Sequence, residues 1–350
     1  MWSKVFSMRT IGFVLFLSFS SCEIFAEKNP DSLRIENLVF EGAGIRGIAY
    51  CGALMELDER GFLQCIDHVG GTSSGSITAC LVSIGYTSAE IFDVIGSTDF
   101  GKFNDGRMGL IGGVSRLRRK LGYYKGKAFL KWMEVLIEAK TGSKNTTFKE
   151  LSGMCNAQTG CVYKDLVIAS TSLNHQRTIY FSAETYPDMR IADAVHASMA
   201  IPLYFEPVVV TPSGAVVDHK KLTKEDHLCV DGGFTANFII NYYDTKDERG
   251  EVIYAPTLGL RLDSDEQINN DQDDKHLAYQ QISTTGDFVG AFFYMIKETL
   301  NRQQLTDVDW GRTVSISDCG MSPKVKKLSV AEKDQLINAG RNGVLNFVEK

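Results

Sequence analysis

Ile66-Asp67-His68-Val69-Gly70-Gly71-Thr72-Ser73-Ser74-Gly75 is the stretch of sequence that decides the fold. Its apolar start, Ile66 to Val69, predicts a strand, and the segment Ile77 to Gly85 beyond it predicts a helix. Between the two, Gly71 to Gly75 has the form G-x-S-x-G. Small neighbours allow the sharp turn that lifts the hydroxyl of Ser73 clear of a sheet. The stretch therefore predicts a nucleophile elbow.

A second glycine-rich loop, Gly42-Ala43-Gly44-Ile45-Arg46-Gly47, lies upstream of the elbow. It follows an apolar segment from Asn37 to Phe40, which predicts a strand. It precedes Ile48 to Arg60, whose apolar residues share one helical face and which Gly61 ends. Glycine-rich backbone ahead of a helix leaves N–H groups unpaired, so this loop could hold either a phosphate or the oxyanion of a tetrahedral intermediate.

The same loop also satisfies the G-x-G-x-x-G pattern of dinucleotide-binding folds. Those folds place an acidic residue at the end of the second strand, where it reaches a ribose hydroxyl. Asp67 has about the right offset, but it stands at the start of its strand, and the end of that strand carries the serine motif. We therefore expect no nucleotide and no other cofactor.

The order strand, helix, strand, helix predicts an α/β fold with a mostly parallel sheet and helices on both faces. No repeat or long linker marks a domain boundary, so we expect one domain over residues 35–348. Further strands are predicted at Leu166–Ser170, Thr178–Phe181, Val208–Val210, Leu228–Val230 and Thr257–Leu262. Further helices are predicted at Phe129–Ala139, Ile191–Met199, 288–303 and 330–349.

The N-terminal residues 1–26 differ from the rest of the chain. Lys4 and Arg9 precede an apolar run from Ile11 to Phe19, which small residues and Cys22 follow. This order predicts a secretory signal, and the run is too short to span a bilayer. The residues up to Cys22 also resemble a bacterial lipoprotein signal, while cleavage after Ala26 and an uncleaved anchor are the alternatives. We expect an exported protein that is secreted, periplasmic or membrane-associated.

Charge and cysteine content exclude other classes of protein. The formal net charge of -6 gives no general attraction to nucleic acid. The eight cysteines form no C-x-x-C pair and no zinc pattern, so we expect no metal site. Cys155 and Cys161 bracket a turn-rich segment that could close a disulfide after export, and unpaired thiols are the alternative.

Asp231-Gly232-Gly233 is a third candidate element, and it follows the apolar segment Leu228–Val230. An aspartate at a strand end, with glycines behind it, is well placed to face a site at the edge of a sheet. As an isolated tripeptide it is also typical of a simple turn.

Taken in order, these elements resemble the patatin-like phospholipase family. The family has a glycine-rich loop that ends in Arg or Lys and Gly, then G-x-S-x-G, and then D-G-G. Before the last motif it carries Ala-Ser-x-Ala-x-Pro-x-x-Phe-x-Pro-Val, which this chain matches from Ala197 to Val208. The resemblance covers most of the mature chain. It departs at Glu41, at Ala43, and at Asn237-Phe238-Ile239, where the family often has a proline.

The resemblance implies a three-layer α/β/α fold and a metal-independent hydrolase that cleaves phospholipid esters at a membrane or micelle surface. Ser73 matches the nucleophile and Asp231 the base of a catalytic dyad. The implied oxyanion donors are the amides of Gly42, Ala43, Gly44 and Ser74. Arg46 and Gly47 match the residues that support the loop, and the glycines of the two short motifs are Gly71, Gly75, Gly232 and Gly233.

Two other functions stay open. A Ser-His-Asp hydrolase would use one of the six histidines, of which His196 is closest to the Pro202 segment; the others are His68, His175, His219, His227 and His276. The second alternative is a lipid-binding protein that has kept the fold and lost catalysis. Residues 107–124 mix apolar side chains with Arg116, Arg118, Arg119 and Lys120, which is typical of an interfacial lid or of a solvated basic surface.

Overall fold

The computed structural model describes residues 34–106, 109–156, 162–273, 276–302 and 304–349. The predicted signal at residues 1–26, with Cys22, lies outside the described residues, as does Cys161 of the predicted disulfide. Among the residues in these ranges, no helix combines the length and the apolar character needed to span a bilayer.

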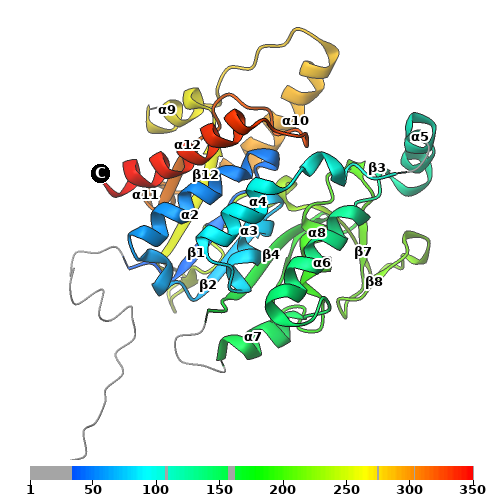
Figure 1. Ribbon diagram of the computed structural model, residues 1–350, viewed down its shortest axis with the longest axis horizontal. Coiled ribbons are helices and arrows are strands. Elements are labelled where there is room, and N and C mark those ends of the chain that lie inside the picture. The colour runs from blue at the N-terminus through cyan, green and yellow to red at the C-terminus, as the bar shows by residue number, and fades with distance from the viewer. Residues whose placement is uncertain (1–33, 107–108, 157–161, 274–275, 303, 350) are drawn as a thin grey trace, which may run out of the picture.

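A nine-stranded sheet forms the middle layer (Figure 1). Its path runs β13 (Thr313–Ser317), β12 (Thr257–Asp263), β1 (Asn37–Phe40), β2 (His68–Thr72), β4 (Asp165–Ser172), β9 (His227–Asp231), β7 (Val208–Val210), β8 (Val216–Val217). The strands from β13 to β4 are parallel, whereas β9, β7, β8 and β5 (Arg177–Phe181), which pairs with β4, are antiparallel. The predicted sheet with a parallel centre is confirmed, and the antiparallel edge adds to it.

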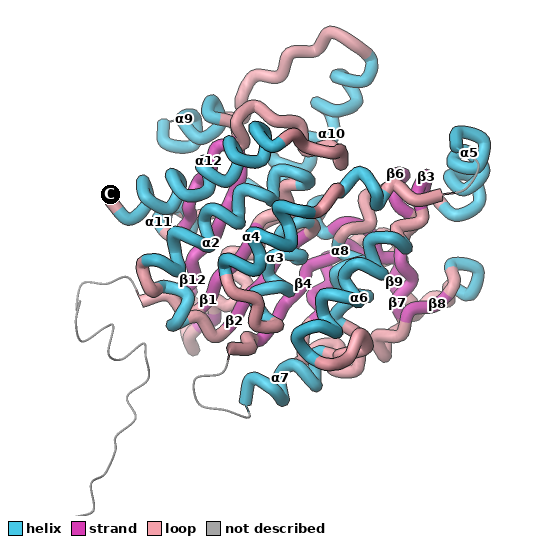
Figure 2. The backbone as a smooth tube through the Cα atoms, in the orientation of Figure 1, coloured by secondary structure: helices cyan, strands magenta, loops and turns pink. Residues whose placement is uncertain are grey.

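Helices and loops cover both faces of the sheet, which gives the predicted three layers (Figure 2). Leu38 and Phe40 of β1 belong to the larger core cluster, together with residues of α2 (Ala49–Glu59), α3 (Ser74–Ser83) and α12 (Val330–Val348). Val39 alternates to the opposite face, where Phe238 and Ile239 cover it. Each strand of the centre is therefore buried on both faces, as expected of a parallel sheet.

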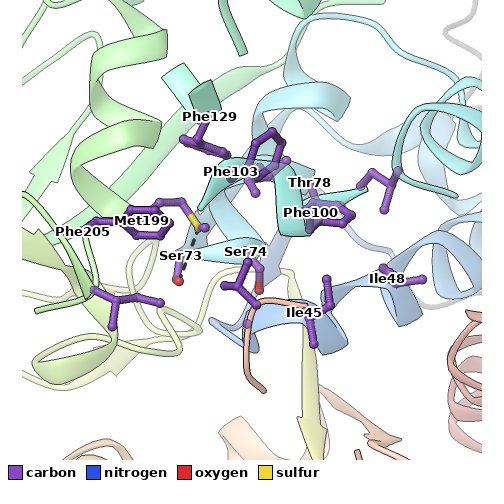
Figure 3. Close-up of a pocket in the computed structure, with 16 residues that line it drawn as sticks. Ile45, Ile48, Ser73, Ser74, Thr78, Phe100, Phe103, Phe129, Met199 and Phe205 are labelled. Atoms are coloured by element: carbon purple, nitrogen blue, oxygen red, sulfur yellow. Dashed lines mark hydrogen bonds between the residues drawn. The ribbon is translucent and has the colours of Figure 1, made fainter. Parts of the chain in front are cut away.

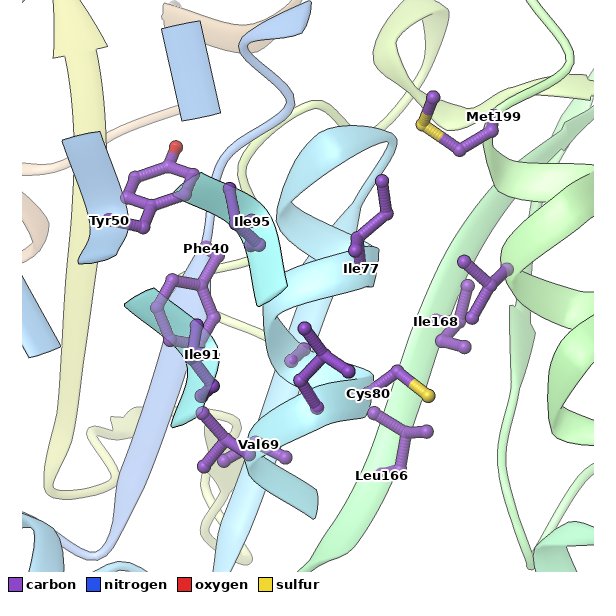
Figure 4. Packing of buried hydrophobic residues seen from close by; sticks show 14 of the residues in the cluster. Phe40, Tyr50, Val69, Ile77, Cys80, Ile91, Ile95, Leu166, Ile168 and Met199 are labelled. Atoms are coloured by element: carbon purple, nitrogen blue, oxygen red, sulfur yellow. The ribbon is translucent and has the colours of Figure 1, made fainter. Parts of the chain in front are cut away.

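The larger core fixes the helix that follows the elbow serine. Figure 4 shows Cys80 of α3 beside Leu166 and Ile168 of β4. Phe40 of β1 meets Tyr50 of α2 edge to face, with ring centroids 5.3 Å apart. Full burial of such side chains contributes about 1.5–3 kcal/mol each, so α3 is held firmly at the position that the site requires.

The remaining helices surround this frame. They are α4 (Ser88–Ser97), α5 (Gly109–Lys120), α6 (Lys127–Thr141), α7 (Phe148–Asn156), α8 (Ile191–Ser198), α9 (Asp265–Asp273), α10 (Thr285–Arg302) and α11 (Asp307–Gly311). Two short pairs of strands lie outside the main sheet. β10 (Thr245–Lys246) pairs antiparallel with β11 (Val252–Ile253), and β3 (Gly122–Tyr124) pairs parallel with β6 (Leu203–Phe205). The predicted helices near 129–139, 191–199, 288–303 and 330–349 are all present.

The strand register brings two of the predicted site residues together. Thr72, at the end of β2, pairs with Ala169 of β4, and the next residue of β4, Ser170, pairs with Asp231 of β9. Ser73 follows Thr72 directly. Because β9 runs antiparallel to β4, its last residue lies opposite the carboxyl-terminal half of β4, beside the elbow.

Candidate active site

Ser73 stands on a strained turn between β2 and α3. Its backbone has φ 52° and ψ -124°, a combination that non-glycine residues rarely adopt. A Cβ atom on Gly71 would lie 2.4 Å from the carbonyl oxygen of Gly75, and one on Gly75 would lie 2.3 Å from that of Phe40. Only glycine fits at these two positions. The geometry is that of a nucleophile elbow.

The hydroxyl of Ser73 donates a hydrogen bond to Asp231 Oδ2 at 2.6 Å. The other carboxylate oxygen, Oδ1, accepts from the amide of Gly233 at 2.7 Å. Ser73 is 6% exposed and Asp231 is 7% exposed. Burial raises the pKa of Asp231 above its ordinary value, and the hydrogen bonds from Ser73 and Gly233 act in the opposite direction. The carboxylate is thus held against the hydroxyl and is more basic than an exposed aspartate.

The segment that follows α8 supports both members of this pair. Ser198 Oγ accepts from the amide of Ser73 at 2.8 Å and donates to the carbonyl of Ala169 at 2.6 Å. The amide of Asp231 donates to the carbonyl of Ala200 at 2.9 Å. Met199 lies between these residues, with its sulfur 3.6 Å from Ser73 Oγ. The Ala197–Val208 match therefore has a structural role in fixing the elbow serine and the aspartate.

The glycines of the D-G-G motif allow close packing beside Asp231. A Cβ atom on Gly232 would lie 2.5 Å from the carbonyl oxygen of Ala169, and one on Gly233 would lie 2.9 Å from Asp231 Oδ1. Both glycines are the first residues of the 3-10 helix η5 (Gly232–Phe234), whose N-terminus Asp231 caps. Asp231 thus caps a turn with one carboxylate oxygen and accepts the hydrogen bond of Ser73 with the other.

The four predicted oxyanion donors differ in their surroundings. The amide of Gly42 donates to the carbonyl of Asn237 at 3.1 Å, and that of Ala43 donates to Ser74 Oγ at 3.0 Å. Gly44 and Ser74 are the first residues of η1 (Gly44–Ile48) and α3, where amides have no partner within the helix. Gly44 and Ser74 line the same pocket as Ser73, and Gly42 and Ala43 do not.

The amide of Gly42 is thus occupied in this structure, and its predicted role as an oxyanion donor stays a prediction. Its amide is already satisfied by a backbone carbonyl, and a neutral amide–carbonyl bond inside the protein would have to break before the donor became available. A Cβ atom on Gly42 would lie 2.5 Å from the side-chain oxygen of Asn237 and 3.1 Å from Cβ of Ser73. Glycine at this position allows this close packing.

Arg46 holds the glycine-rich loop in place. Its Nε donates to the carbonyl of Ala43 at 3.1 Å, and its guanidinium pairs with Asp318 at 2.6 Å. The amide of Ile45 donates to the carbonyl of Pro323 at 3.2 Å. A Cβ atom on Gly47 would lie 2.9 Å from Ser74 Oγ, so this glycine lets the loop approach α3. Asp318 and Pro323 were not predicted, because only the folded chain brings them to this loop.

Asn237 connects the glycine-rich loop to the D-G-G motif. Its carbonyl accepts from Gly42, and its side-chain amide donates to Glu41 Oε1 at 2.8 Å. Asn301 of α10 accepts from the amide of Asn237 at 2.6 Å and donates to the carbonyl of Gly233 at 3.3 Å. Burial raises the pKa of Glu41, and the fully buried guanidinium of Arg261 opposes that shift. The departure from the family pattern at Glu41 is thus part of a buried polar network.

An apolar pocket opens beside Ser73 (Figure 3). It encloses about 600 Å³, part of which is open solvent. Its walls come from the loop at Ile45, from α3, from η3 (Phe100–Phe103), from α6 and from the segment after α8. The apolar lining residues are Ile45, Ile48, Ile77, Ile95, Phe100, Phe103, Phe129, Met199, Ile201, Phe205 and Val325. Such a lining accommodates a hydrocarbon chain with its end at the serine.

Among the described residues, no histidine lines this pocket, and none bonds to Ser73. Burial lowers the pKa of His196 to about 4, and its buried Nε2 has no hydrogen-bond partner in the described chain. His227 bonds to Ser172 on the antiparallel side of the sheet. Among the described residues there is also no group of three or more His, Cys, Asp or Glu side chains arranged to hold a metal ion.

The described part of the basic segment, residues 109–124, lies outside the pocket wall. It contains α5 and β3, and neither contributes a lining residue. Lys120 pairs with Asp218 at 3.0 Å, and Arg116 donates to the carbonyl of Tyr123 at 2.8 Å. A lid at this position is therefore not supported by the pocket geometry.

The elbow, the carboxylate and the three-layer frame define an α/β protein with a serine–aspartate site beside an apolar pocket. The chain belongs to the patatin-like phospholipase family, whose model matches residues 38–243. This match includes both short motifs and the glycine-rich loop. The prediction of the family from its motifs is confirmed.

Individual relatives agree with this assignment. An uncharacterised protein of Acanthamoeba polyphaga mimivirus is 32% identical over 219 residues, which cover 62% of this chain and 64% of that protein, slightly less than two thirds of its length. A probable lipid hydrolase of Invertebrate iridescent virus 6 is 28% identical over 247 residues, covering 66% and 74%. The crystal structure of VipD from Legionella pneumophila superposes with a TM-score of 0.55 at 14% identity, covering 90% of this chain and 67% of that one, and shows the shared fold.

Proposed function

We propose that this protein is a lipid acyl hydrolase of the phospholipase A or lysophospholipase type, with Ser73 as nucleophile and Asp231 as base. The observation that carries the proposal is the 2.6 Å hydrogen bond to a buried carboxylate from the Oγ of Ser73, which lines an apolar pocket. Membership of the patatin-like phospholipase family and the likeness to a probable lipid hydrolase support an ester of a lipid as substrate.

The reaction proceeds in two halves. As Ser73 Oγ attacks the ester carbonyl, its proton passes to Asp231, and the amides of Gly44 and Ser74 stabilise the oxyanion. The protonated Asp231 then gives its proton to the leaving alcohol oxygen, and an acyl-enzyme forms. Water then attacks this ester with Asp231 again as base, Asp231 returns the proton to the leaving Ser73 Oγ, and the fatty acid is released. The amides and the positive end of α3 supply the field that the developing charge requires, so the chemistry is metal-independent.

The shape of the pocket favours a substrate with one long hydrocarbon chain. Most of the lining side chains are apolar, and the polar ones belong to Ser73, Ser74 and Thr78. A soluble polar ester would leave this surface unfilled. A phospholipid at a membrane or micelle surface can place one acyl chain in it and keep its headgroup in water.

The direct test is product analysis on a phospholipid with two different acyl chains. We expect the wild type to release one free fatty acid and the matching lysophospholipid, detected by mass spectrometry, and Ser73→Ala to release neither. A folded wild type that binds the lipid without releasing fatty acid, and behaves as Ser73→Ala does, would instead identify a lipid-binding protein without catalysis.

The rate is expected to depend on the ionisation of Asp231. Burial raises its pKa, so the ionised form that accepts the proton of Ser73 is lost at a higher pH than for an ordinary aspartate, whose pKa is about 3.9. We expect kcat/KM for a soluble ester to fall as pH is lowered through this raised pKa while circular dichroism stays constant. A rate that stays level down to about pH 4 would contradict this assignment.

We also propose that the protein is exported. The basic and apolar order of residues 1–26 supports this proposal, because that order is typical of a secretory signal.

A further inference from the structure

The segment Met321–Lys327, called the strap from here on, crosses the rim of the pocket. Its Pro323 accepts the hydrogen bond from Ile45 of the glycine-rich loop, and the same carbonyl would lie 2.3 Å from a Cβ atom on Gly44. Val325 lines the pocket. The amide nitrogen of Lys327 lies 3.5 Å from the Cβ position of Gly101 in η3. The strap therefore runs from the loop beside Ser73 to the opposite wall.

Alternation along the strap separates apolar from charged side chains. Val325 lines the pocket and is partly buried, whereas its neighbours Lys324 and Lys326, and then Lys327, are exposed. Lys102 of η3, next to Gly101, is exposed as well. An acyl chain that enters the pocket thus passes a rim whose outer side carries lysines.

Two carboxylates neighbour these lysines. Glu332 pairs with Lys326 at 2.9 Å. Asp287, near the start of α10, has its pKa lowered by hydrogen bonds from Thr284 and Ser283, and the charge of Lys324 adds to this shift. Lys102 and Lys327 have no ion-pair partner in the part of the chain that the structure describes. The rim therefore keeps positive charge although the whole chain has a formal net charge of -6.

The first half of α10 presents an apolar face to solvent beside the strap. Phe288, Phe292 and Met295, spaced four and three residues apart, are 60%, 51% and 50% exposed. This spacing places them on one side of the helix. On the segment before the helix, Tyr279 and Ile282 are also exposed. The second half of α10 is anchored behind the site through Asn301 and the buried Glu298. Figure 2 shows α10 next to the loop that leads into α12.

We propose that the strap and the exposed face of α10 together form a docking face for a lipid surface with anionic headgroups. The inference rests on the proposed lipid substrate and identifies the surface from which that substrate reaches the pocket. Aromatic and aliphatic side chains insert below the headgroups, and lysines at the edge pair with phosphates. Because Val325 belongs to both the strap and the pocket wall, a surface bound here faces the pocket entrance. A lipid then moves into the site without crossing bulk water.

Vesicle binding tests this face with the full chain, prepared identically for every variant. Sedimentation uses ether-linked lipids, which contain no ester, as phosphatidylcholine alone or in equal parts with phosphatidylglycerol. We expect Phe288→Ser with Phe292→Ser to weaken binding to both vesicles by about tenfold. We expect Lys324→Glu with Lys327→Glu to weaken binding to the anionic vesicles alone, by about fivefold or more for each charge.

Matched controls lie at other exposed places. Val252→Ser with Ile253→Ser changes exposed apolar residues of β11, and Lys144→Glu with Lys149→Glu changes exposed lysines before and within α7. Both control pairs are expected to bind as the wild type does. Turnover of a soluble ester, measured on all variants, should be unchanged, because none of these residues belongs to the catalytic machinery.

Three results would overturn the docking face. They are unchanged binding in both test pairs, equal loss in the control pairs, or loss confined to Arg118→Glu with Arg119→Glu on α5. A separate measurement tests the proposed function: if the soluble ester shows no turnover that depends on Ser73, the proposed function is wrong. A protein that hydrolyses the ester through Ser73 but binds vesicles independently of the strap and α10 keeps its function and loses only this inference.

Discussion

Asp231→Asn is expected to lower kcat/KM for a soluble ester by about a thousandfold or more, which is the upper range for loss of a general base. Asparagine has the same shape and can still accept the hydrogen bond from Gly233 through its oxygen. It cannot take the proton of Ser73, so the hydroxyl stays a weak nucleophile. The measurement is steady-state turnover of the purified variant, with circular dichroism to show that the fold is intact.

Two further variants make this result decisive. Ser73→Ala should reach the same residual rate, and the double variant should be no slower, because residues that act as one unit are not additive. His196→Asn should keep most of its turnover, since no contact joins this histidine to Ser73. If Asp231→Asn keeps its rate while a folded histidine variant loses it, the site contains a histidine-based triad.

Gly340→Ala is expected to destabilise the protein by about 3 kcal/mol or more, because α12 crosses α2 with the two backbones in contact. A Cβ atom on Gly340 would lie 1.9 Å from the carbonyl oxygen of Ala49, and one on Gly52 would lie 1.8 Å from that of Ile337. Backbone cannot yield to the new methyl group as a flexible side chain could. Urea unfolding monitored by tryptophan fluorescence measures the loss.

The matched control is Gly153→Ala within α7. Nothing lies within 4 Å of a Cβ atom at this position. Alanine is the better helix former by about 0.8–1.0 kcal/mol, so the control should be slightly more stable than the wild type. Equal stability changes in the two variants would show that the α2–α12 contact is looser than the structure has it.

The elements around the elbow could be predicted because their signals are local. Asn37–Phe40 was predicted to the residue, and the helices at α2 and α6 to within a few residues, since apolar periodicity and glycine boundaries fixed them. α4 was not predicted, although the capping box of Thr87 and Glu90 marks its start. The antiparallel direction of β9 could not be predicted, because strand direction depends on long-range pairing.

The candidate site also contains residues that local motifs predict and residues that only long-range packing brings into place. Ser73 and Asp231 follow from short motifs, because the backbone at those positions needs the neighbouring glycines. Asn237 and Asn301 carry no such signal, as their roles arise only when α10 packs behind the D-G-G motif. The commitment of the Gly42 amide to Asn237 could not be foreseen for the same reason.

Covalent labelling with an alkyl fluorophosphonate tests the central claim most directly. The reagent phosphonylates a serine only where a base activates the hydroxyl and donors hold the oxyanion. Peptide mapping by mass spectrometry is expected to place one adduct on Ser73, with none on Ser73→Ala and much slower labelling of Asp231→Asn. An adduct on a different residue, or equal labelling rates for the wild type and Asp231→Asn, would contradict the account of Ser73 and Asp231 as a catalytic pair.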